Sequence, residues 1–151
     1  MYRNSEGYPA PTEGYVYAKL MREYRQKQRE IYRRNEEIKH RPRVYIVSKY
    51  AGDVEKNVEA AQFYCKAAIR QKRIPIASHL LYPQVLDDTD PAQRELGLLF
   101  GHVLLAMCDE IWVCGTEYSE GMQAEIHEAK RLKKPITYFN ERMEQLHEND
   151  R

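Results

Sequence analysis

The chain has 151 residues, of which 42% are hydrophobic and 31% charged, a composition that suits one globular domain with an appendage. Its formal net charge of +1 provides no overall field that would favour a nucleic acid or a membrane surface as partner. No apolar stretch resembles a signal peptide or could span a bilayer, so we expect a cytoplasmic protein. The three cysteines form no CxxC pair, which favours reduced, buried thiols over a disulfide framework.

Residues 1–42 are predicted to form an irregular lead-in and then a long charged helix, because residues 15–39 contain neither Pro nor Gly. Apolar residues recur there every seven positions, at Tyr17, Tyr24, Ile31 and Ile38. Lys27 and Arg34 occupy the other seam positions, so the apolar seam is narrow. Such a helix has to pack on its own domain or on a partner. Nucleic-acid binding is disfavoured because glutamates interrupt the basic face.

Residues 43–140 alternate between short apolar runs and amphipathic helical patterns. Four strands are predicted at 44–47, 74–77, 110–114 and 135–139. The three helices between them have Asp53, Asp90 and Ser119 as predicted N-caps. Strands of this apolar kind are typical of a parallel sheet covered on both faces. We therefore predict a three-layer, Rossmann-like (flavodoxin-like) α/β domain of four to five strands, with a charged tail at 141–151.

The segment with the strongest functional signal runs from Ser119 to Glu125. A serine that caps a helix N-terminus favours a phosphate there, and Gly121 lets a ligand approach closely, with Met122 beside it. On a helical wheel Glu125 lies about 60° from Met122, inside the apolar stripe of the helix. A carboxylate aimed at the buried side needs a cation, a donor network or a ligand pocket. The structural alternative is a glutamate that pairs with a basic residue or tilts into solvent.

Other candidate contacts follow the remaining strands, because ligands of such folds bind beyond the carboxyl ends of the strands. These candidates are Ser48, Tyr50, Gly52, His79, Tyr82 and Gly115. A plain turn after the first strand and a packed loop histidine are the alternatives. The chain lacks the GxGxxG and GxxxxGK[ST] patterns, which disfavours dinucleotide and P-loop chemistry. No metal-ligand spacing is present, and nothing indicates a metal, flavin or nicotinamide cofactor.

These residues together resemble the nucleoside 2-deoxyribosyltransferase-like superfamily, and within it a short, uncharacterised branch of bacteria and phages. The resemblance covers residues 44–139. It rests on the motifs Ser48-x-Tyr50-x-Gly52-Asp53, Pro75-x-Ala77-x-His79, Cys108-Asp109-Glu110-Ile111-Trp112-Val113 and Ser119-x-Gly121-x-x-x-Glu125-x-x-x-Ala129. It implies that Ser119 contacts a nucleotide phosphate and that Glu125 is a nucleophile. Residues 2–8 also resemble an opening found in phage and prophage proteins.

The activity that the resemblance implies is that of an N-glycosyl hydrolase or (deoxy)ribosyltransferase. Glu125 would attack the anomeric carbon of a nucleoside, a nucleotide or an NAD-like substrate and expel the base. Superfamily members assemble as oligomers, so the resemblance also implies a homodimer or larger homo-oligomer. Asn140, after the last strand, is placed to reach a neighbouring subunit's site.

The chain departs from the superfamily pattern at Gly101, where characterised members carry a second acidic residue. Asp109 is our first candidate for that role, and Asp87, Asp88 and Glu95 are others. The departure keeps open a binding protein of phage or prophage origin that sequesters or senses a nucleotide ligand without catalysis. A structural protein whose helix at 15–39 docks a partner is the third alternative.

Overall fold

The computed structural model describes residues 5–7 and 13–147. It separates into two compact units, residues 1–40 and 41–151, which are treated one at a time below. The segment that resembles phage proteins, residues 2–8, lies outside the described residues except for positions 5–7. The last four residues of the charged tail also lie outside them.

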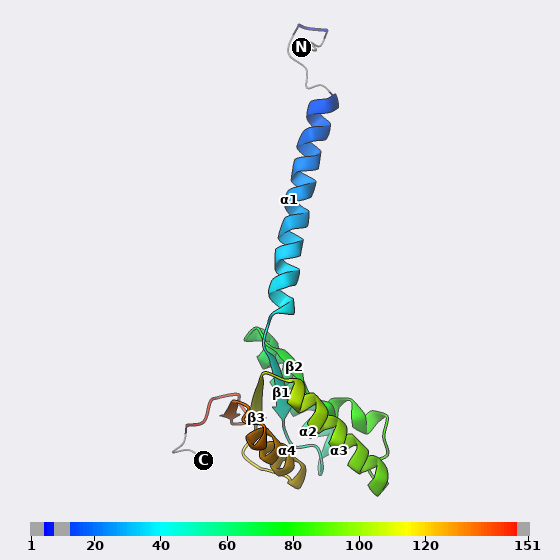
Figure 1. Cartoon of the computed structure of the whole chain (residues 1–151), viewed down its shortest axis with the longest axis vertical. Coiled ribbons are helices and arrows are strands. Elements are labelled where there is room, and N and C mark those ends of the chain that lie inside the picture. Colours follow the sequence, from blue (N-terminus) through cyan, green and yellow to red (C-terminus); the bar gives the residue numbers. More distant parts are fainter. Residues whose placement is uncertain (1–4, 8–12, 148–151) are drawn as a thin grey trace. The chain divides into compact units, whose positions relative to one another are not determined.

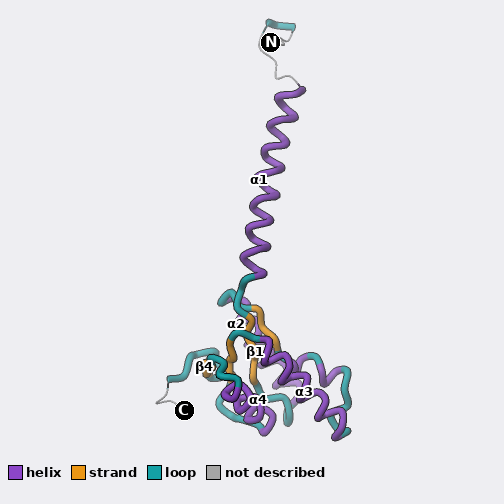
Figure 2. Tube along the Cα trace, viewed as in Figure 1, coloured by secondary structure: helices purple, strands orange, loops and turns teal. Residues whose placement is uncertain are grey.

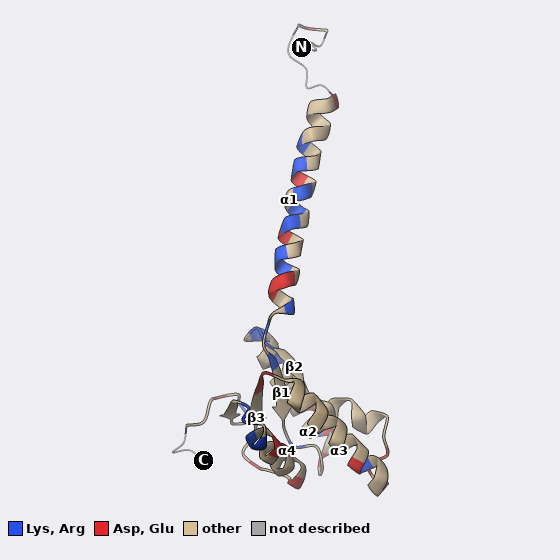
Figure 3. Ribbon diagram, viewed as in Figure 1, with Lys and Arg blue, Asp and Glu red and all other residues tan. Residues whose placement is uncertain are grey.

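The first unit contains the expected long helix, α1 (Glu13–Lys39) (Figure 1). None of its residues is buried, and lysines, arginines and glutamates alternate along it (Figure 3). Contacts within the helix support it, since Gln26 lies 3.5 Å from Glu30 and Lys39 forms a 3.1 Å ion pair with Glu36. Such pairs, three or four residues apart, stabilise a helix that lacks a packed face.

The second unit is built on a parallel sheet of four strands (Figure 2). In chain order these are β1 (Arg43–Val47), β2 (Ile74–Ile76), β3 (Glu110–Cys114) and β4 (Ile136–Phe139). The spatial order is β2-β1-β3-β4, with all three strand pairs parallel. The predicted α/β fold with a parallel sheet is therefore confirmed. The short strand that contains Pro75 lies at an edge, where a missing N–H costs least.

Three helices connect the strands, and each starts after the predicted cap. Asp53 precedes α2 (Val54–Arg70), Asp90 precedes α3 (Pro91–Met107) and Ser119 precedes α4 (Glu120–Arg131). In each case the cap side chain accepts a hydrogen bond from a first-turn N–H, which satisfies an otherwise unpaired donor. Two 3₁₀ turns, η1 (Ser78–Leu80) and η2 (Tyr82–Gln84), lie where the sequence predicted only a loop.

The alternation of strand side chains divides the core into two layers. Residues such as Tyr45 and Val113 pack against α3 and α4 on one face of the sheet. Residues such as Ile46 and Trp112 pack against α2 on the other face. From β1 the chain passes to β2 on one side of β1, and from β2 it crosses to β3 on the other side. The switch point of the sheet therefore lies between β1 and β3. Their carboxyl ends are where a ligand is expected in this fold.

The outer face of α3 is apolar and is not covered by the described part of residues 41–151. Leu98 (38% exposed) lies apart from it, and the other exposed large side chains of α3 fall on one helical stripe: Leu96 (42% exposed), Leu99 (53%), Phe100 (39%), Val103 (59%) and Met107 (54%). Inward-facing positions of the same helix include Gly101 and Leu105, which are buried.

All three cysteines are free thiols, with Cys108 and Cys114 buried and Cys65 half-buried. Within residues 5–7 and 13–147 no group of three or more His, Cys, Asp or Glu side chains is arranged to hold a metal ion. No helix in the described part of the chain has both the length and the apolar character needed to cross a membrane.

Candidate active site

A cavity of about 300 Å³ lies beyond the carboxyl end of β1, on the side of the sheet that α3 and α4 cover. Its walls come from the loop after β1, from η1 and η2, from the first half of α3 and from the first turns of α4. Eight residues selected from the sequence line it: Ser48, Tyr50, His79, Tyr82, Ser119, Gly121, Met122 and Glu125. The fold thus brings together side chains from four separate loops and helices.

Glu125 is held in this cavity by a chain of hydroxyl groups. Tyr45, fully buried on β1, donates a 2.6 Å hydrogen bond to the Glu125 carboxylate. The Tyr45 oxygen lies 2.6 Å from the Ser78 hydroxyl, which is itself buried at the start of η1. Because the single proton of Tyr45 goes to Glu125, Ser78 is the donor in the second bond. The inward orientation predicted from the helical wheel thus has its physical counterpart, a donor network.

The surroundings of Glu125 suit a carboxyl group that changes protonation near neutral pH. Burial raises the pKa of Glu125 to about 7, and the hydrogen bond from Tyr45 opposes part of that rise. Burial and the nearby Glu125 carboxylate raise the pKa of Tyr45 well above its usual range, so this hydroxyl remains a donor. The Glu125 carboxylate is partly buried and one of its oxygens accepts the bond from Tyr45, so the other oxygen is available to a substrate.

Gly101 is the position where the resemblance described above led us to expect an acidic residue, and its space is occupied. A Cβ atom built there would lie 3.0 Å from the Tyr45 hydroxyl oxygen and 3.2 Å from that of Ser78. It would lie 3.6 Å from a carboxylate oxygen of Glu125. The hydroxyl pair therefore fills the place where a side chain from α3 would otherwise approach Glu125.

Ser48 and His79 form a second polar pair in the cavity wall. The Ser48 hydroxyl lies 2.8 Å from Nε2 of His79, across the ends of β1 and β2. Burial lowers the pKa of His79 to about 4, so the imidazole is neutral at pH 7. The pair offers a ligand neutral donors and acceptors and contributes no charge.

The N-terminus of α4 forms another part of the wall. The Ser119 side chain caps the helix through a 3.3 Å bond from the N–H of Met122. The N–H groups of Glu120 and Gly121 belong to the first turn of α4, so they have no acceptor within the helix. Such a turn is suited to an anionic group of a ligand.

Two predicted contacts lie elsewhere. Gly115 lines a separate cavity of about 340 Å³ on the side of the sheet that α2 covers, together with Glu141. Gly52 lines neither cavity and has a φ of 101°, which explains a glycine at the turn before α2. The Asn140 side chain is engaged in its own turn, where it binds Arg142 and Glu144.

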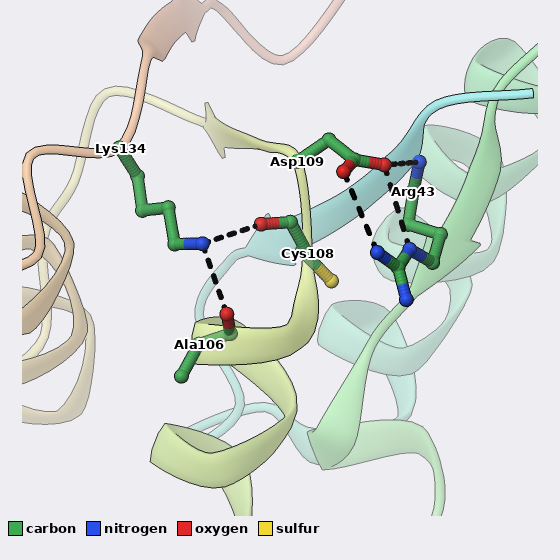
Figure 4. A network of polar contacts seen from close by, with 5 residues as sticks. All are labelled: Arg43, Ala106, Cys108, Asp109 and Lys134. Carbon is green, nitrogen blue, oxygen red and sulfur yellow. Dashed lines mark hydrogen bonds and ion pairs between the residues drawn. The ribbon is translucent and has the colours of Figure 1, made fainter.

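Asp109, our first candidate for a second catalytic acid, lies at the amino end of the strands, which is the end of the sheet opposite Glu125. It precedes β3, and its carboxylate accepts a 2.8 Å hydrogen bond from the N–H of Arg43, where β1 begins (Figure 4). The bonds from Arg43 hold the pKa of Asp109 below its ordinary value. Lys134 donates two 2.9 Å bonds to the carbonyl oxygens of Ala106 and Cys108 beside it (Figure 4). Asp109 therefore joins the amino ends of two strands and is separated from the cavity.

Sequence reasoning missed Tyr45 and Ser78. Both were assigned to apolar runs or turns, because the contact that matters joins residues 80 positions apart. One signal was available: a tyrosine inside a strand that faces a buried helix needs a partner for its hydroxyl. The inward-facing glutamate on that helix was the natural candidate.

Comparison with solved structures finds two named proteins that are similar to this chain. The 2-deoxyribosyltransferase from the psychrotolerant bacterium Bacillus psychrosaccharolyticus has a TM-score of 0.55 at 12% identity, over 65% of this chain and 72% of that chain. The 2-desoxiribosyltransferase from Leishmania mexicana has a TM-score of 0.46 at 13% identity, over 66% of this chain and 64% of that chain. At 12% identity the likeness to the Bacillus psychrosaccharolyticus protein concerns the fold. No curated protein sequence matches this chain.

A family model described as Domain of unknown function (DUF7768) matches residues 42–139. The match spans the four strands, the three connecting helices and every residue of the cavity described above. The chain therefore belongs to the DUF7768 family.

Proposed function

We propose that this protein is an N-glycosyl hydrolase or (deoxy)ribosyltransferase that acts on a nucleoside, a nucleotide or an NAD-like substrate through Glu125. The observation that carries the proposal is the Glu125 carboxylate in a cavity of about 300 Å³, oriented by the 2.6 Å bond from buried Tyr45. The fold of the Bacillus psychrosaccharolyticus protein, which is named a 2-deoxyribosyltransferase, supports it.

In the proposed reaction the free oxygen of Glu125 forms a bond to the anomeric carbon as the bond from that carbon to the base nitrogen breaks. The base leaves with the bonding electron pair and takes a proton from water at the open cavity. Water, or a second base, then attacks the same carbon and releases Glu125 as a carboxylate. The donor from Tyr45 holds the carboxylate in place, and the neutral Ser48–His79 pair contacts the substrate without adding charge.

The roles of the other cavity residues follow from their positions. Ser119 and Gly121, at the N-terminus of α4, would bind a phosphate or another anionic group of the substrate. Tyr50 and Tyr82 supply aromatic surface, and Met122 lines the wall beside Glu125.

The second candidate function is non-catalytic binding of a nucleotide-derived ligand. Gly101 favours it, because the place of a second acid is filled by the Tyr45 and Ser78 hydroxyls. In that case the cavity keeps its ligand without breaking the glycosidic bond. Loss of Ser119 would then weaken the function more than loss of the Glu125 charge.

One experiment separates the two functions. Wild type and Glu125→Ala are incubated with ribo- and deoxyribonucleosides, their 5′-monophosphates and NAD, and free base is measured by liquid chromatography. Base released by the wild type and not by the variant supports catalysis. Stabilisation of both proteins by one compound, with no base released, supports the binding function.

We also propose a homo-oligomer, a dimer or larger, assembled through the apolar stripe of α3. Five large side chains on one face of a helix, each more than a third exposed, form a patch of a kind that marks an interface. A second copy is the occupant that fits best, because a two-fold contact places an apolar stripe against an identical one.

A further inference from the structure

The face of α3 that borders the cavity carries two residues without side chains and then one with a long charged side chain. Gly97 lies four residues before Gly101, and Arg94 lies three residues before Gly97. This spacing places all three on one helical face. Gly101 faces Glu125, and Gly97 and Arg94 line the cavity further towards the start of the helix. At 1.5 Å per residue, Arg94 lies about 10 Å along the helix from Gly101.

Gly97 lets the opposite wall of the cavity pack closely against the middle of this face. A Cβ atom there would lie 3.4 Å from Cδ1 of Leu86 and 3.9 Å from Cβ of Tyr82. The surrounding surface comes from Tyr82, Pro83, Leu86 and Leu98. These side chains give the cavity an apolar and aromatic wall, which suits the face of a planar ring.

At the far end of this wall stand two charged side chains of opposite sign. Among the described residues Arg94 is the only lysine or arginine that lines the cavity, and Asp88 lies at the same rim. Both also line a neighbouring hollow beside Leu98, so the two share the mouth of the cavity. Within the described part of the chain neither side chain has a hydrogen-bond or ion-pair partner, and both residues are exposed to solvent.

Gln93, the neighbour of Arg94, differs in being fully engaged. Its side-chain oxygen accepts a 2.8 Å bond from the N–H of Asp87, and its nitrogen donates a 3.1 Å bond to Asp90. These bonds fix the loop that carries Asp88 against α3. Recognition at this rim therefore falls to Asp88 and Arg94, a carboxylate and a guanidinium that are both free to pair.

We infer that the base of the substrate is guanine, with Arg94 and Asp88 as its specificity-determining residues. This inference rests on the proposed function, since it places the sugar at Glu125. Guanine presents two adjacent acceptors, O6 and N7, which suit the two-pronged guanidinium, and two adjacent donors, N1–H and the 2-amino group, which suit a carboxylate. Adenine offers neither pair. Cytosine offers a single amine to Asp88 in place of two adjacent donors.

Binding to Glu125→Gln, which keeps an acceptor for Tyr45 but lacks the nucleophilic carboxylate, tests the inference without turnover. Isothermal titration is run with the guanine, hypoxanthine, adenine and cytosine nucleosides, each as ribo- and deoxyribo- form. Guanine nucleosides are expected to bind most tightly. Hypoxanthine lacks the 2-amino group and is expected to bind about 5- to 150-fold more weakly, the range for one lost bidentate contact.

Further substitutions in the Glu125→Gln background assign the contacts. Asp88→Asn should remove most of the difference between guanine and hypoxanthine nucleosides, and Arg94→Met should weaken both. The matched controls are Glu95→Gln, which lines only the neighbouring hollow, and Arg70→Met on exposed α2, and both should leave all affinities unchanged.

Adenine or cytosine nucleosides that bind as tightly as guanine nucleosides would overturn the inference, as would an unchanged guanine preference in Asp88→Asn. The proposed function fails separately. Tight guanosine binding without any base release by the wild type contradicts catalysis and leaves the base assignment standing. Release of a different base contradicts only the assignment, and no binding of any nucleoside contradicts both.

Discussion

The hydroxyl of Tyr45 and the carboxylate of Glu125 lie 2.6 Å apart although 80 positions separate them in the chain. The bond joins the middle of the first strand to the second turn of the last helix. It orients a carboxyl group whose pKa is raised by burial to about 7. The following predictions test this relationship and its surroundings.

Tyr45→Phe should shift the dependence of activity on pH towards alkaline values. A nucleophilic carboxylate must be ionised, so wild-type activity should rise as pH increases through about 7. Removing the donor takes away the bond that favours the ionised form, so the pKa of Glu125 should rise further. Profiles of kcat/KM against pH measure this. Tyr64→Phe, a buried tyrosine on the other face of the sheet, is the control, and an unchanged profile in Tyr45→Phe contradicts the account.

Glu125→Gln should stabilise the protein at pH 8 and leave its stability at pH 4 nearly unchanged. Folding raises the pKa of Glu125 from 4.5 to about 7. The contribution of this group to the free energy of unfolding is therefore fully present below about pH 4.5 and is lost as the pH rises through 7. At pH 8 the glutamine variant avoids that loss, worth at most about 3 kcal/mol. Urea unfolding at the two pH values measures the difference. Exposed Glu59→Gln on α2 should show no such dependence, and an equal effect of Glu125→Gln at both pH values would refute the buried-carboxyl assignment.

Gly101→Ala should destabilise the fold by about 1–3 kcal/mol even though alanine favours helices. The new Cβ would lie 3.0 Å from the Tyr45 oxygen and displace the hydroxyl that orients Glu125. In a Tyr45→Phe background that oxygen is absent, so the cost of Gly101→Ala should shrink. A double-mutant cycle by chemical denaturation measures the coupling. Additive effects would mean that the hydroxyl does not occupy this space in solution.

Ser119→Ala should lower stability by about 1 kcal/mol through the lost cap of α4. It should also weaken binding of a nucleoside 5′-monophosphate more than binding of the nucleoside, because the first turn of α4 would hold the phosphate. Asp53→Ala removes the cap of α2 and serves as the control for the loss of a cap alone. Equal weakening of both ligands by Ser119→Ala would place the phosphate elsewhere.

Val103→Glu should convert the oligomer into a monomer, since it places a charge in the middle of the exposed stripe of α3. Light scattering coupled to size exclusion measures the mass at micromolar concentration. Ile69→Glu, at a residue that is also 54% exposed but lies on α2, should leave the assembly intact. A wild type that is monomeric under these conditions refutes the proposed assembly.

Local chemistry explains why much of the fold was predictable. The strands are continuous apolar runs, and the caps Asp53, Asp90 and Ser119 satisfy first-turn donors, so both signals lie within a few residues of the element they define. The inward position of Glu125 follows from helical spacing alone. Its partner does not, because Tyr45 becomes its neighbour only when β1 packs beneath α4.

Two other features show what a one-dimensional pattern leaves open. The apolar spacing of α3 is real, but five of its large residues face outwards, and periodicity does not distinguish a core face from an interface. Asp109 was our first candidate for the second acid, whereas parallel strands place a residue that precedes β3 at the end of the sheet opposite the cavity.

The most direct test of the central claim is to trap the bond between the sugar and Glu125. A nucleoside whose sugar carries fluorine at C2 slows the second step, so the glycosyl-enzyme should accumulate and be visible by intact mass and peptide mapping. The account predicts one added sugar on the peptide that contains Glu125, and none on Glu125→Gln. Release of base with no adduct, or an adduct on another residue, would contradict Glu125 as the nucleophile.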